Sequence, residues 1–252
     1  MTRAFQGGSI RRLAERAGLG PPLRRAKRLL RGDPPPPAWK VRADLDDVAM
    51  RVLIAGLLAE DDSCIDVGAG LGDILADIVR LAPRGKHIAF EPVPFQSEIV
   101  RERFPTVDVR NAAASDSAGV TSFTFAKNYP AYSGFRPRDY PGDPGIETIT
   151  VKTERIDDVV AESGTPPALI KIDVEGAEAQ VLRGAMQTLR EHRPMVVFEH
   201  GLSAREYGTT SAEIYELLCG EADLRIFDLD GNGPYTDDEF ATAKYWNFVA
   251  HR

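Results

Sequence analysis

Acidic side chains lie in or directly after short apolar runs at three places in the sequence. Asp66 lies within the first run, Glu91 follows the second, and Asp173 and Glu175 follow the third. Such runs, alternating with helical patterns, indicate parallel β-strands whose carboxyl ends meet at one edge of a sheet. Ligands of open α/β sheets bind at that edge. We therefore expect the four carboxylates to lie around a ligand site.

The first of these acids belongs to a glycine-rich turn between a predicted strand and a predicted helix, with the sequence Ile65-Asp66-Val67-Gly68-Ala69-Gly70-Leu71-Gly72-Asp73. Dinucleotide-binding folds carry glycines at the first, third and sixth positions of a similar turn. Counted from Gly68, the sixth position here is Asp73, so the third glycine of that fingerprint is missing. The carboxylates of Asp66 and Asp73 would also repel a diphosphate at the helix N-terminus. The turn therefore disfavours a dinucleotide.

A ligand with an ammonium and a sulfonium centre suits these carboxylates, and its own carboxylate can bind the free N–H groups of the helix N-terminus. S-adenosylmethionine carries all of these groups. Glycines allow the backbone to approach such a ligand closely. The residues of the turn that we expect to contact this cofactor are Asp66, Gly68, Ala69, Gly70 and Gly72.

Two further segments complete the predicted cofactor site. Glu91 ends the second strand, where an acid can accept hydrogen bonds from both hydroxyls of a ribose, and Pro92 adjoins it. Beyond the third strand, the small Ala112 leaves room for a flat base, and the amide of Asn111 can bond to the polar edge of adenine. These four residues are expected to hold the nucleoside.

Strands and helices alternate along most of the chain, which predicts an α/β fold with a mostly parallel sheet and helices on both faces. The strands are expected at residues 64–67, 86–90, 107–109, 168–172, 195–198, 224–229 and 246–250. The helices that follow the first strand are expected at residues 74–81, 95–104, 156–161, 177–191 and 211–219. Between residues 120 and 152 the pattern alternates around a stretch rich in proline and glycine, which indicates a hairpin insertion with a long loop.

A basic segment precedes the predicted domain. Residues 1–43 carry a net charge of +9, so the remainder carries −16 within the total of −7. We predict a basic N-terminal extension with a proline-rich linker at residues 1–38, which can contact an anionic surface or partner, and a domain at residues 39–252. The acidic charge of that domain argues against nucleic-acid binding.

Composition narrows the cellular setting. A hydrophobic content of 43% in 252 residues can fill a core, and no apolar run approaches the roughly 20 residues that span a bilayer. The two cysteines, Cys64 and Cys219, lie far apart in apolar runs, which predicts no disulfide and fits a reducing cytoplasm. The sequence carries no signal for the oligomeric state.

Four segments stand in the order typical of one methyltransferase family. They are Ile65-Asp66-Val67-Gly68-Ala69, Phe90-Glu91-Pro92-Val93, Leu169-Ile170-Lys171-Ile172-Asp173-Val174-Glu175-Gly176-Ala177-Glu178 and Val181-Leu182-Arg183-Gly184-Ala185. On these residues the chain resembles the FkbM-type S-adenosylmethionine-dependent O-methyltransferases over residues 63–200. The longest segment is the specific signature, whereas the glycine turn is general to methyltransferases.

The resemblance implies a Rossmann-like, seven-stranded class I methyltransferase fold. It implies methyl transfer to a hydroxyl of a small molecule, namely a sugar, a glycolipid or a polyketide natural product. It also implies cofactor contacts at Gly68, Gly70, Glu91 and Asp173. N-methylation on the same scaffold and a non-catalytic, cofactor-binding scaffold protein stay open as alternatives.

Removal of a proton from a hydroxyl acceptor calls for a base. Of the four histidines, His200 is the best candidate because it follows a predicted strand near the one that carries Asp173. Asp173, Glu175 and Glu199 are the other candidates for the base. Together with His200 they could hold Mg²⁺, but the spacing does not show that they converge, so no metal is expected.

The long loop of the insertion is rich in aromatic and basic residues. Aromatic rings suit the faces of sugars or polyketides, and arginine suits a phosphate or carboxylate on the acceptor. We therefore expect this loop to overhang the strand ends as a lid over the substrate. The candidate substrate-binding residues are Tyr132, Ser133, Phe135 and Arg136.

Overall fold

The computed structural model describes residues 35–137, 140, 142–201 and 207–252. The chain divides into two units, Met1–Leu45 and Asp46–Arg252. The division falls inside helix α3 (Ala38–Leu57), seven residues after the predicted end of the basic extension at residue 38. Most of the predicted basic arm, residues 1–34, lies outside the described residues. Within the described ranges, every helix is too short or too polar to reach across a lipid bilayer.

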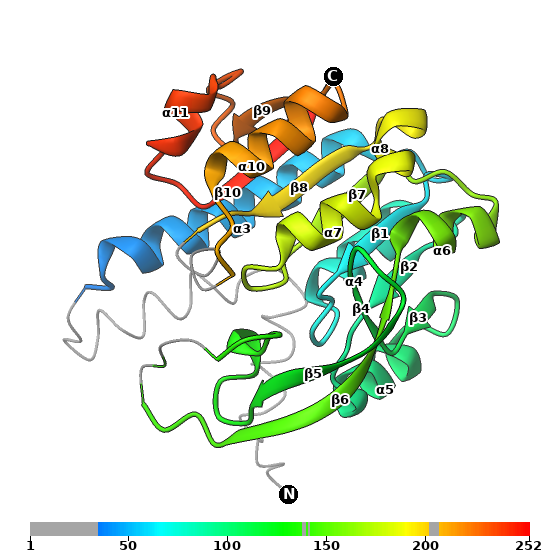
Figure 1. Ribbon diagram of the computed structural model, residues 1–252. Coiled ribbons are helices and arrows are strands. Elements are labelled where there is room, and N and C mark those ends of the chain that lie inside the picture. The colour runs from blue at the N-terminus through cyan, green and yellow to red at the C-terminus, as the bar shows by residue number, and fades with distance from the viewer. Residues whose placement is uncertain (1–34, 138–139, 141, 202–206) are drawn as a thin grey trace, which may run out of the picture. The chain divides into compact units, whose positions relative to one another are not determined.

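Seven strands form the main sheet, in the order β3-β2-β1-β7-β8-β10-β9 (Figure 1). They are β1 (Cys64–Val67), β2 (Ile88–Phe90), β3 (Asp108–Arg110), β7 (Leu169–Ile172), β8 (Met195–Glu199), β9 (Arg225–Asp228) and β10 (Asn247–His251). The first five strands in spatial order run parallel, and β10 runs antiparallel to both of its neighbours. The predicted Rossmann-like α/β fold is confirmed, and each strand begins and ends within two residues of its predicted bounds.

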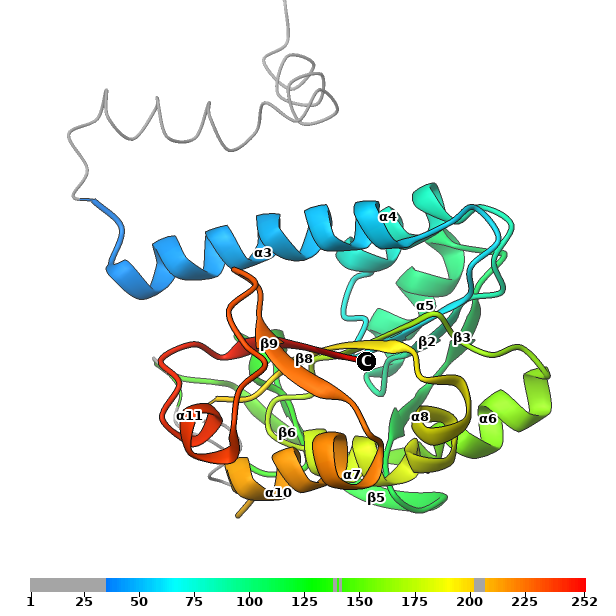
Figure 2. The same cartoon turned by 90° about the horizontal axis from the view of Figure 1, so that it is seen from above.

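Helices cover both faces of this sheet, as Figure 2 shows for α4 on one side and α7 and α10 on the other. The helices after α3 are α4 (Asp73–Leu81), α5 (Pro94–Arg103), α6 (Ile156–Ser163), α7 (Glu178–Gly184), α8 (Met186–His192), α10 (Ser211–Tyr215) and α11 (Asp237–Ala241). Successive residues of a strand point to opposite faces, so Ile65 packs with the core under α7 and Cys64 packs with Ile54 of α3. Burial on both faces explains why these strands read as continuous apolar runs.

Two predicted helices are interrupted in the structure. The helix expected at residues 177–191 breaks at Ala185 into α7 and α8. Gly184, just before the break, allows the end of α7 to pass close to Ser115, because a Cβ at this position would collide with the backbone oxygen of Ser115. The helix expected at residues 211–219 is α10, which continues as the π-helical segment η2 (Glu216–Glu221).

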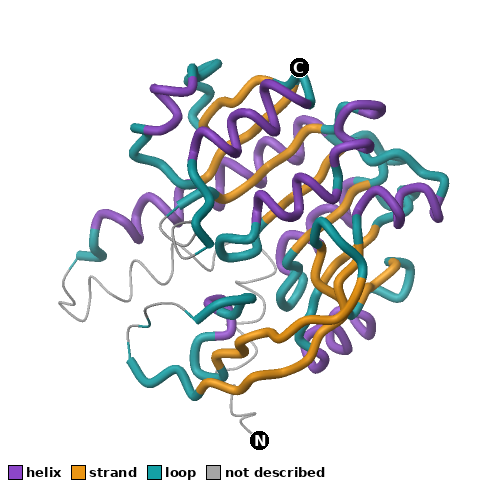
Figure 3. The backbone as a smooth tube through the Cα atoms, viewed as in Figure 1, coloured by secondary structure: helices purple, strands orange, loops and turns teal. Residues whose placement is uncertain are grey.

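A second, three-stranded sheet stands beside the main one (Figure 3). Its order is β4-β6-β5, with β4 (Ala112–Ala114), β5 (Gly119–Ala126) and β6 (Ile146–Glu154). Strands β5 and β6 form the predicted hairpin, and its tip contains the short 3₁₀ helix η1 (Pro130–Tyr132). Strand β4 was not predicted because three consecutive alanines have low β-propensity. It pairs in parallel with β6 and ties the hairpin to the chain that follows β3.

The chain order reverses between β1 and β7. From β1 the chain proceeds outward through β2 and β3, whereas β7 and β8 extend the sheet in the other direction. Loops that leave neighbouring strands on either side of such a switch point diverge and leave a crevice at the carboxyl ends. Of the three acidic segments identified in the sequence, the first begins inside β1 and continues into the turn after it, and the other two follow β2 and β7. All three therefore meet at this crevice.

Candidate active site

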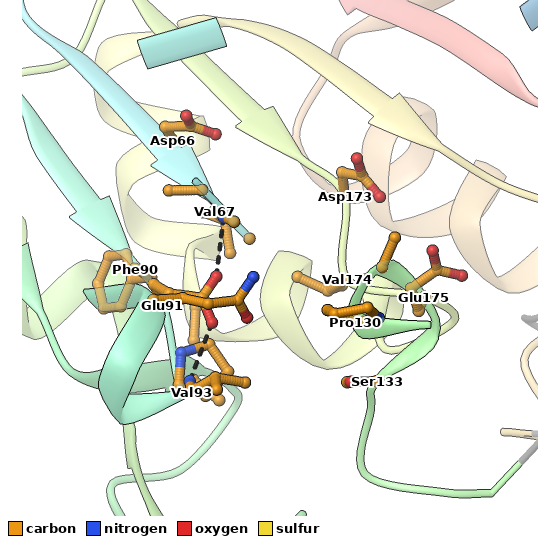
Figure 4. Close-up of a pocket in the computed structure, with 18 of the residues that line it drawn as sticks. Asp66, Val67, Phe90, Glu91, Val93, Pro130, Ser133, Asp173, Val174 and Glu175 are labelled. Carbon is orange, nitrogen blue, oxygen red and sulfur yellow. Dashed lines mark hydrogen bonds between the residues drawn. The ribbon is translucent and has the colours of Figure 1, made fainter. Parts of the chain in front are cut away.

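A cavity of about 540 Å³ occupies the crevice, within the usual range for small-molecule sites. The turns after β1, β2 and β7 form one part of its wall, and the small sheet with its hairpin tip forms another. Figure 4 shows Glu91 on one side and Asp173 and Glu175 on the other, and Pro130 and Ser133 of the hairpin tip also line the cavity. The cavity therefore lies between the two sheets.

The glycine turn lets the chain pass close to β7 and leaves space on the cavity side. Gly68 has a φ of 77°, and a Cβ there would collide with the backbone oxygen of Asp173. Gly70 has a φ of 55°, but a Cβ at this position would meet nothing within 4 Å. Gly70 lines the cavity, so this open space is available to a ligand.

Glu91 is buried at the cavity wall and is held by backbone donors. Its Oε2 accepts a hydrogen bond from the N–H of Gly70 at 2.8 Å, and its Oε1 accepts one from the N–H of Val93 at 2.9 Å. Burial raises the pKa of Glu91 to about 7, although the two backbone donors favour the ionised form. Each carboxylate oxygen has a second lone pair, so Glu91 can still accept hydrogen bonds from a ligand.

A buried lysine neutralises part of the acidic charge. Lys171 Nζ lies 3.3 Å from Asp66 Oδ1 and 3.5 Å from Asp173 Oδ2, and it donates a hydrogen bond to the backbone oxygen of Gly68 at 3.0 Å. Burial alone would lower the pKa of Lys171, but the two carboxylates raise it above its usual value. The lysine therefore stays charged and links β7 to the glycine turn.

The segment after β7 carries further acids in a strained turn. Glu175 lines the cavity with a φ of 57°, in the left-handed region that non-glycine residues seldom adopt. Glu178 Oε1 accepts a hydrogen bond from the N–H of Gly176 at 2.9 Å and so braces this turn. Burial raises the pKa of Glu178 to about 7. Burial and the negative charge of Asp173 raise the pKa of Glu199 well above its usual value.

The cavity brings together most of the predicted cofactor residues and part of the predicted substrate residues. The predicted residues that line it are Asp66, Gly68, Ala69, Gly70, Glu91, Pro92, Ser133, Phe135, Asp173 and Glu175. Among the described residues, the predicted ones outside its lining are Gly72, Asn111, Ala112, Tyr132, Arg136, Glu199 and His200.

Three of the predicted cofactor residues lie outside the lining of the cavity. The amide of Asn111 points back to the turn after β2, where it donates to the backbone oxygens of Glu91 at 3.1 Å and Pro92 at 3.0 Å. Ala112 is fully buried in β4, and its neighbours Ala113 and Ala114 line the cavity instead. Gly72 caps α4 and faces the ring of Phe104. Asn111 and Gly72 thus shape the wall without facing the ligand space.

His200, which is predicted as the base, lies outside the lining of the cavity. Its ring stacks on Phe240 with the centroids 5.3 Å apart, and its Nε2 lies 3.0 Å from Ser211 Oγ. Burial lowers its pKa. The side chain follows β8, one strand beyond β7 and two beyond β1, and packs under α11 and α10. Glu199, beside it, also lies outside the lining of the cavity.

Two predicted substrate residues also lie away from this cavity. Tyr132 packs edge-on against Tyr129, with ring centroids 6.0 Å apart. The guanidinium of Arg136 lies over the ring of Tyr207, 5.6 Å from its centroid. The aromatic ring of Phe135, by contrast, reaches the cavity wall and contacts Phe123 edge-to-face at 5.8 Å.

No group of three or more His, Cys, Asp or Glu side chains in the described part of the chain is arranged to hold a metal ion. The four residues considered as metal ligands, Asp173, Glu175, Glu199 and His200, therefore belong to no such group.

Sequence reasoning did not identify Lys171 as a residue of the cavity wall or Glu178 as the side chain that braces the turn after β7. Lys171 is a charged residue in a strand that is buried along its whole length, and a buried charge requires partners. That signal was present in the sequence. Nothing in the sequence indicated that Glu178, on the first turn of a helix, points inward.

The FkbM methyltransferase domain family matches residues 66–225 of the chain. The methyltransferase sdnD of Sordaria araneosa is 28% identical over 48% of this chain and 59% of sdnD. The 2-O-methyltransferase NoeI of Sinorhizobium fredii (strain NBRC 101917 / NGR234) is 28% identical over 61% of this chain and 70% of NoeI. The 31-O-demethyl-FK506 methyltransferase FkbM of Streptomyces tacrolimicus is 30% identical over 50% of this chain and 60% of that protein.

Among solved structures, the methyltransferase FkbM of Methylobacillus flagellatus KT matches 78% of this chain and 45% of its own, with 17% identity and a TM-score of 0.48. The chain spans less than two thirds of the length of sdnD and of the Streptomyces protein. The family match, in contrast, covers more than half of this chain and includes the turns after β1, β2 and β7 that line the cavity. The chain belongs to the FkbM methyltransferase domain family.

Proposed function

We propose that this protein is an S-adenosylmethionine-dependent O-methyltransferase that acts on a hydroxyl of a sugar or a natural-product small molecule. The observation that carries the proposal is the position of Glu91, buried beside the glycine turn with both oxygens fixed by the N–H groups of Gly70 and Val93. A carboxylate fixed in this way suits the two hydroxyls of a ribose.

The charge of the cavity supports this cofactor. Five acidic side chains and one basic side chain belong to the described residues that line the cavity: Asp66, Asp73, Glu91, Asp173, Glu175 and Lys171. Such a wall favours a ligand with positive charge and disfavours a diphosphate. The open space at Gly70 gives the ligand access to the backbone of the turn. The residues present therefore fit the cofactor, with Glu91 at the ribose and Asp66 and Asp173 toward its positive charge.

The bound cofactor supplies an electrophilic methyl group on a sulfonium centre. The protein contributes orientation, because a wall made by two sheets and the hairpin tip restricts how an acceptor can approach. Asp173 and Glu175 are the carboxylates in the cavity that can accept the proton of an acceptor hydroxyl. Lys171 holds Asp173 in place by its ion pair at 3.5 Å.

The names of two relatives support oxygen as the acceptor atom. NoeI is named as a 2-O-methyltransferase, and FkbM of Streptomyces tacrolimicus is named for methylation of 31-O-demethyl-FK506. We extend O-methylation to this chain as part of the proposal.

Isothermal titration calorimetry with S-adenosylmethionine, S-adenosylhomocysteine and NAD tests the cofactor. We expect both sulfur nucleosides to bind and NAD not to bind, and binding of NAD alone would overturn the assignment. Transfer of a labelled methyl group to hydroxyl acceptors and to matched amines then tests the reaction. Transfer to amines only would identify an N-methyltransferase, and cofactor binding without any transfer would identify a non-catalytic scaffold.

A further inference from the structure

A second pocket of about 340 Å³ adjoins the cavity. Phe135 lines both spaces, so its side chain stands at the junction between them. The wall of the second pocket comes from the turn between β4 and β5, the far ends of β5 and β6, helix α7 and Tyr207. None of the functions argued above uses this pocket.

The inner face of the small sheet runs from the cavity into the second pocket and changes character on the way. On β5, Phe123 lines the cavity and Thr121, two residues earlier and therefore on the same face, lines the pocket. On β6, the buried Val151 is followed on the same face by Thr153, which also lines the pocket. Both strands thus turn from apolar to hydroxyl-bearing side chains as they leave the cavity.

Helix α7 also changes from an apolar to a polar side chain between the cavity and the second pocket. Ala177, at its N-terminus, lines the cavity, and Gln180, three residues later on the same side of the helix, lines the pocket. The Oε1 atom of Gln180 is buried and has no hydrogen-bond partner within the described part of the protein. A buried amide oxygen without a partner is costly, and a ligand that donates a hydrogen bond to it would remove that cost.

The remaining wall is fixed and carries balanced charge. The Tyr207 hydroxyl accepts a hydrogen bond from the backbone N–H of Arg136 at 3.3 Å, and the guanidinium of Arg136 lies over the tyrosine ring. Asp116 is the acidic counterpart of Arg136 among the described residues of the pocket wall. With one charge of each sign, the pocket favours neither an anion nor a cation.

We propose that this pocket binds a neutral, hydroxyl-rich part of the methyl acceptor, and that Gln180 and Thr121 determine its specificity. The inference rests on the proposed function, because it places the rest of the acceptor next to the cavity in which its reacting hydroxyl lies. Hydroxyl groups both donate and accept, and so match the amide and threonine groups on these walls. An entirely apolar acceptor would leave those groups unpaired.

Saturation-transfer NMR on the full chain, saturated with S-adenosylhomocysteine, tests the proposal. The probes are the methyl glycosides of mannose, galactose and rhamnose, with cyclohexanol and a hexose phosphate as apolar and anionic comparators. We expect at least one glycoside to bind in preference to both comparators. Loss of one hydrogen bond in Gln180→Met or Thr121→Val should weaken that glycoside about fivefold.

Thr150→Val is the matched control. Thr150 is exposed on β6 and pairs with Ser122, which places it on the face of the small sheet opposite to Thr121. It should leave glycoside affinity unchanged, and all three variants should keep the native affinity for S-adenosylhomocysteine. Three results would overturn the proposal: no preference for a glycoside, unchanged glycoside affinity in both pocket variants, or equal weakening by Thr150→Val. Failure of the proposed function would instead appear as a native chain that does not bind S-adenosylhomocysteine. Glycoside binding to the native chain and its variants is then measured without S-adenosylhomocysteine, and the same three results would overturn the proposal.

Discussion

Glu91 connects the turn after β1 to the turn after β2. Its two oxygens accept from Gly70 and from Val93, which are 23 positions apart in the sequence. Asn111 adds a third segment, because its amide donates to the backbone oxygens of Glu91 and Pro92. The carboxylate that we propose to bind the ribose is therefore oriented before any ligand arrives, which would reduce the entropy cost of binding.

Gly70→Val should reduce the affinity for S-adenosylhomocysteine by about a hundredfold or more, because the side chain would occupy space that the ligand needs. Gly164→Val is the matched control. Gly164 has a similar φ of 62° and equally open surroundings, but it ends α6 outside the cavity. Calorimetry on both variants, with urea unfolding to compare their stability, checks the prediction. Equal affinities in the two variants would show that the ligand does not approach Gly70.

Glu91 should make cofactor affinity depend on pH. Burial raises its pKa to about 7, so the carboxyl is mostly protonated at lower pH and ionised at higher pH. Hydroxyl donors of a ribose favour the ionised form, and affinity should therefore rise about tenfold between pH 6 and pH 8. Glu91→Gln should bind more weakly and lose this rise, because an amide cannot accept from both Gly70 and Val93 or ionise.

Glu178 provides a control for the pH dependence. Burial raises its pKa to about 7 as well, but Glu178 does not line the cavity. Glu178→Gln should keep the rise in affinity with pH, as measured by calorimetry at several pH values. If the rise in affinity persisted in Glu91→Gln and disappeared in Glu178→Gln, the titrating group would be Glu178, and the prediction for Glu91 would be wrong.

At the scale of elements, the pair of parallel strands β1 and β7 is the foundation of the site. Their register places Asp66 opposite Lys171, and the lysine also reaches Asp173 at the end of its own strand. A buried charge needs a partner, so this ion pair fixes which residues emerge at the carboxyl edge.

Lys171→Met should destabilise the protein by about 3–5 kcal/mol, because it leaves Asp66 buried without a counter-charge. Lys152→Met, at an exposed position on β6, should change the free energy of unfolding by less than about 0.5 kcal/mol. Urea denaturation measures both. The double variant Asp66→Asn/Lys171→Met should recover part of the loss. A Lys171→Met protein as stable as the Lys152→Met protein would contradict the importance of the ion pair.

The sequence predicted the elements better than the directions of their side chains. Apolar runs located the seven strands because both faces of a central parallel sheet are buried. The same pattern placed Asp173 and His200 at one edge, but it did not show that β8 lies a strand farther from the switch point. His200 therefore packs on Phe240 instead of facing the cavity.

Asn111 and β4 show two other limits of sequence reasoning. A side-chain amide that follows a strand can form hydrogen bonds with a ligand or with a neighbouring turn. The amide of Asn111 donates to the turn after β2. The alanines of β4 pair in parallel with β6, which is more than thirty residues away in the sequence, and no local pattern encodes such a pairing. Tertiary contacts decided both cases.

At the scale of the whole second unit, the small sheet closes the space that the main sheet leaves open. Phe123 and Phe135 reach the cavity from the hairpin, and Thr121 continues the same face into the second pocket. The main sheet thus supplies the residues proposed to bind the cofactor, while the small sheet supplies the residues proposed to meet the acceptor. This division predicts that the two binding events can be separated by mutation.

Phe135→Ala should raise the KM for a hydroxyl acceptor about tenfold, because it removes the aromatic wall between the two pockets. The affinity for S-adenosylhomocysteine should change by less than about threefold, since Glu91 and the glycine turn are untouched. Tyr129→Ala is the control, because Tyr129 packs on Tyr132 in the same segment but lines neither pocket. Steady-state kinetics and calorimetry measure both effects, and equal loss of acceptor and cofactor binding in Phe135→Ala would argue against the division.

A crystal structure of the full chain with S-adenosylhomocysteine tests the central claim most directly. The account predicts the ribose hydroxyls at the carboxylate of Glu91, with the rest of the ligand along the turn at Gly68 and Gly70. A nucleoside bound anywhere else, with Glu91 contacting only the backbone N–H groups of Gly70 and Val93, would contradict it.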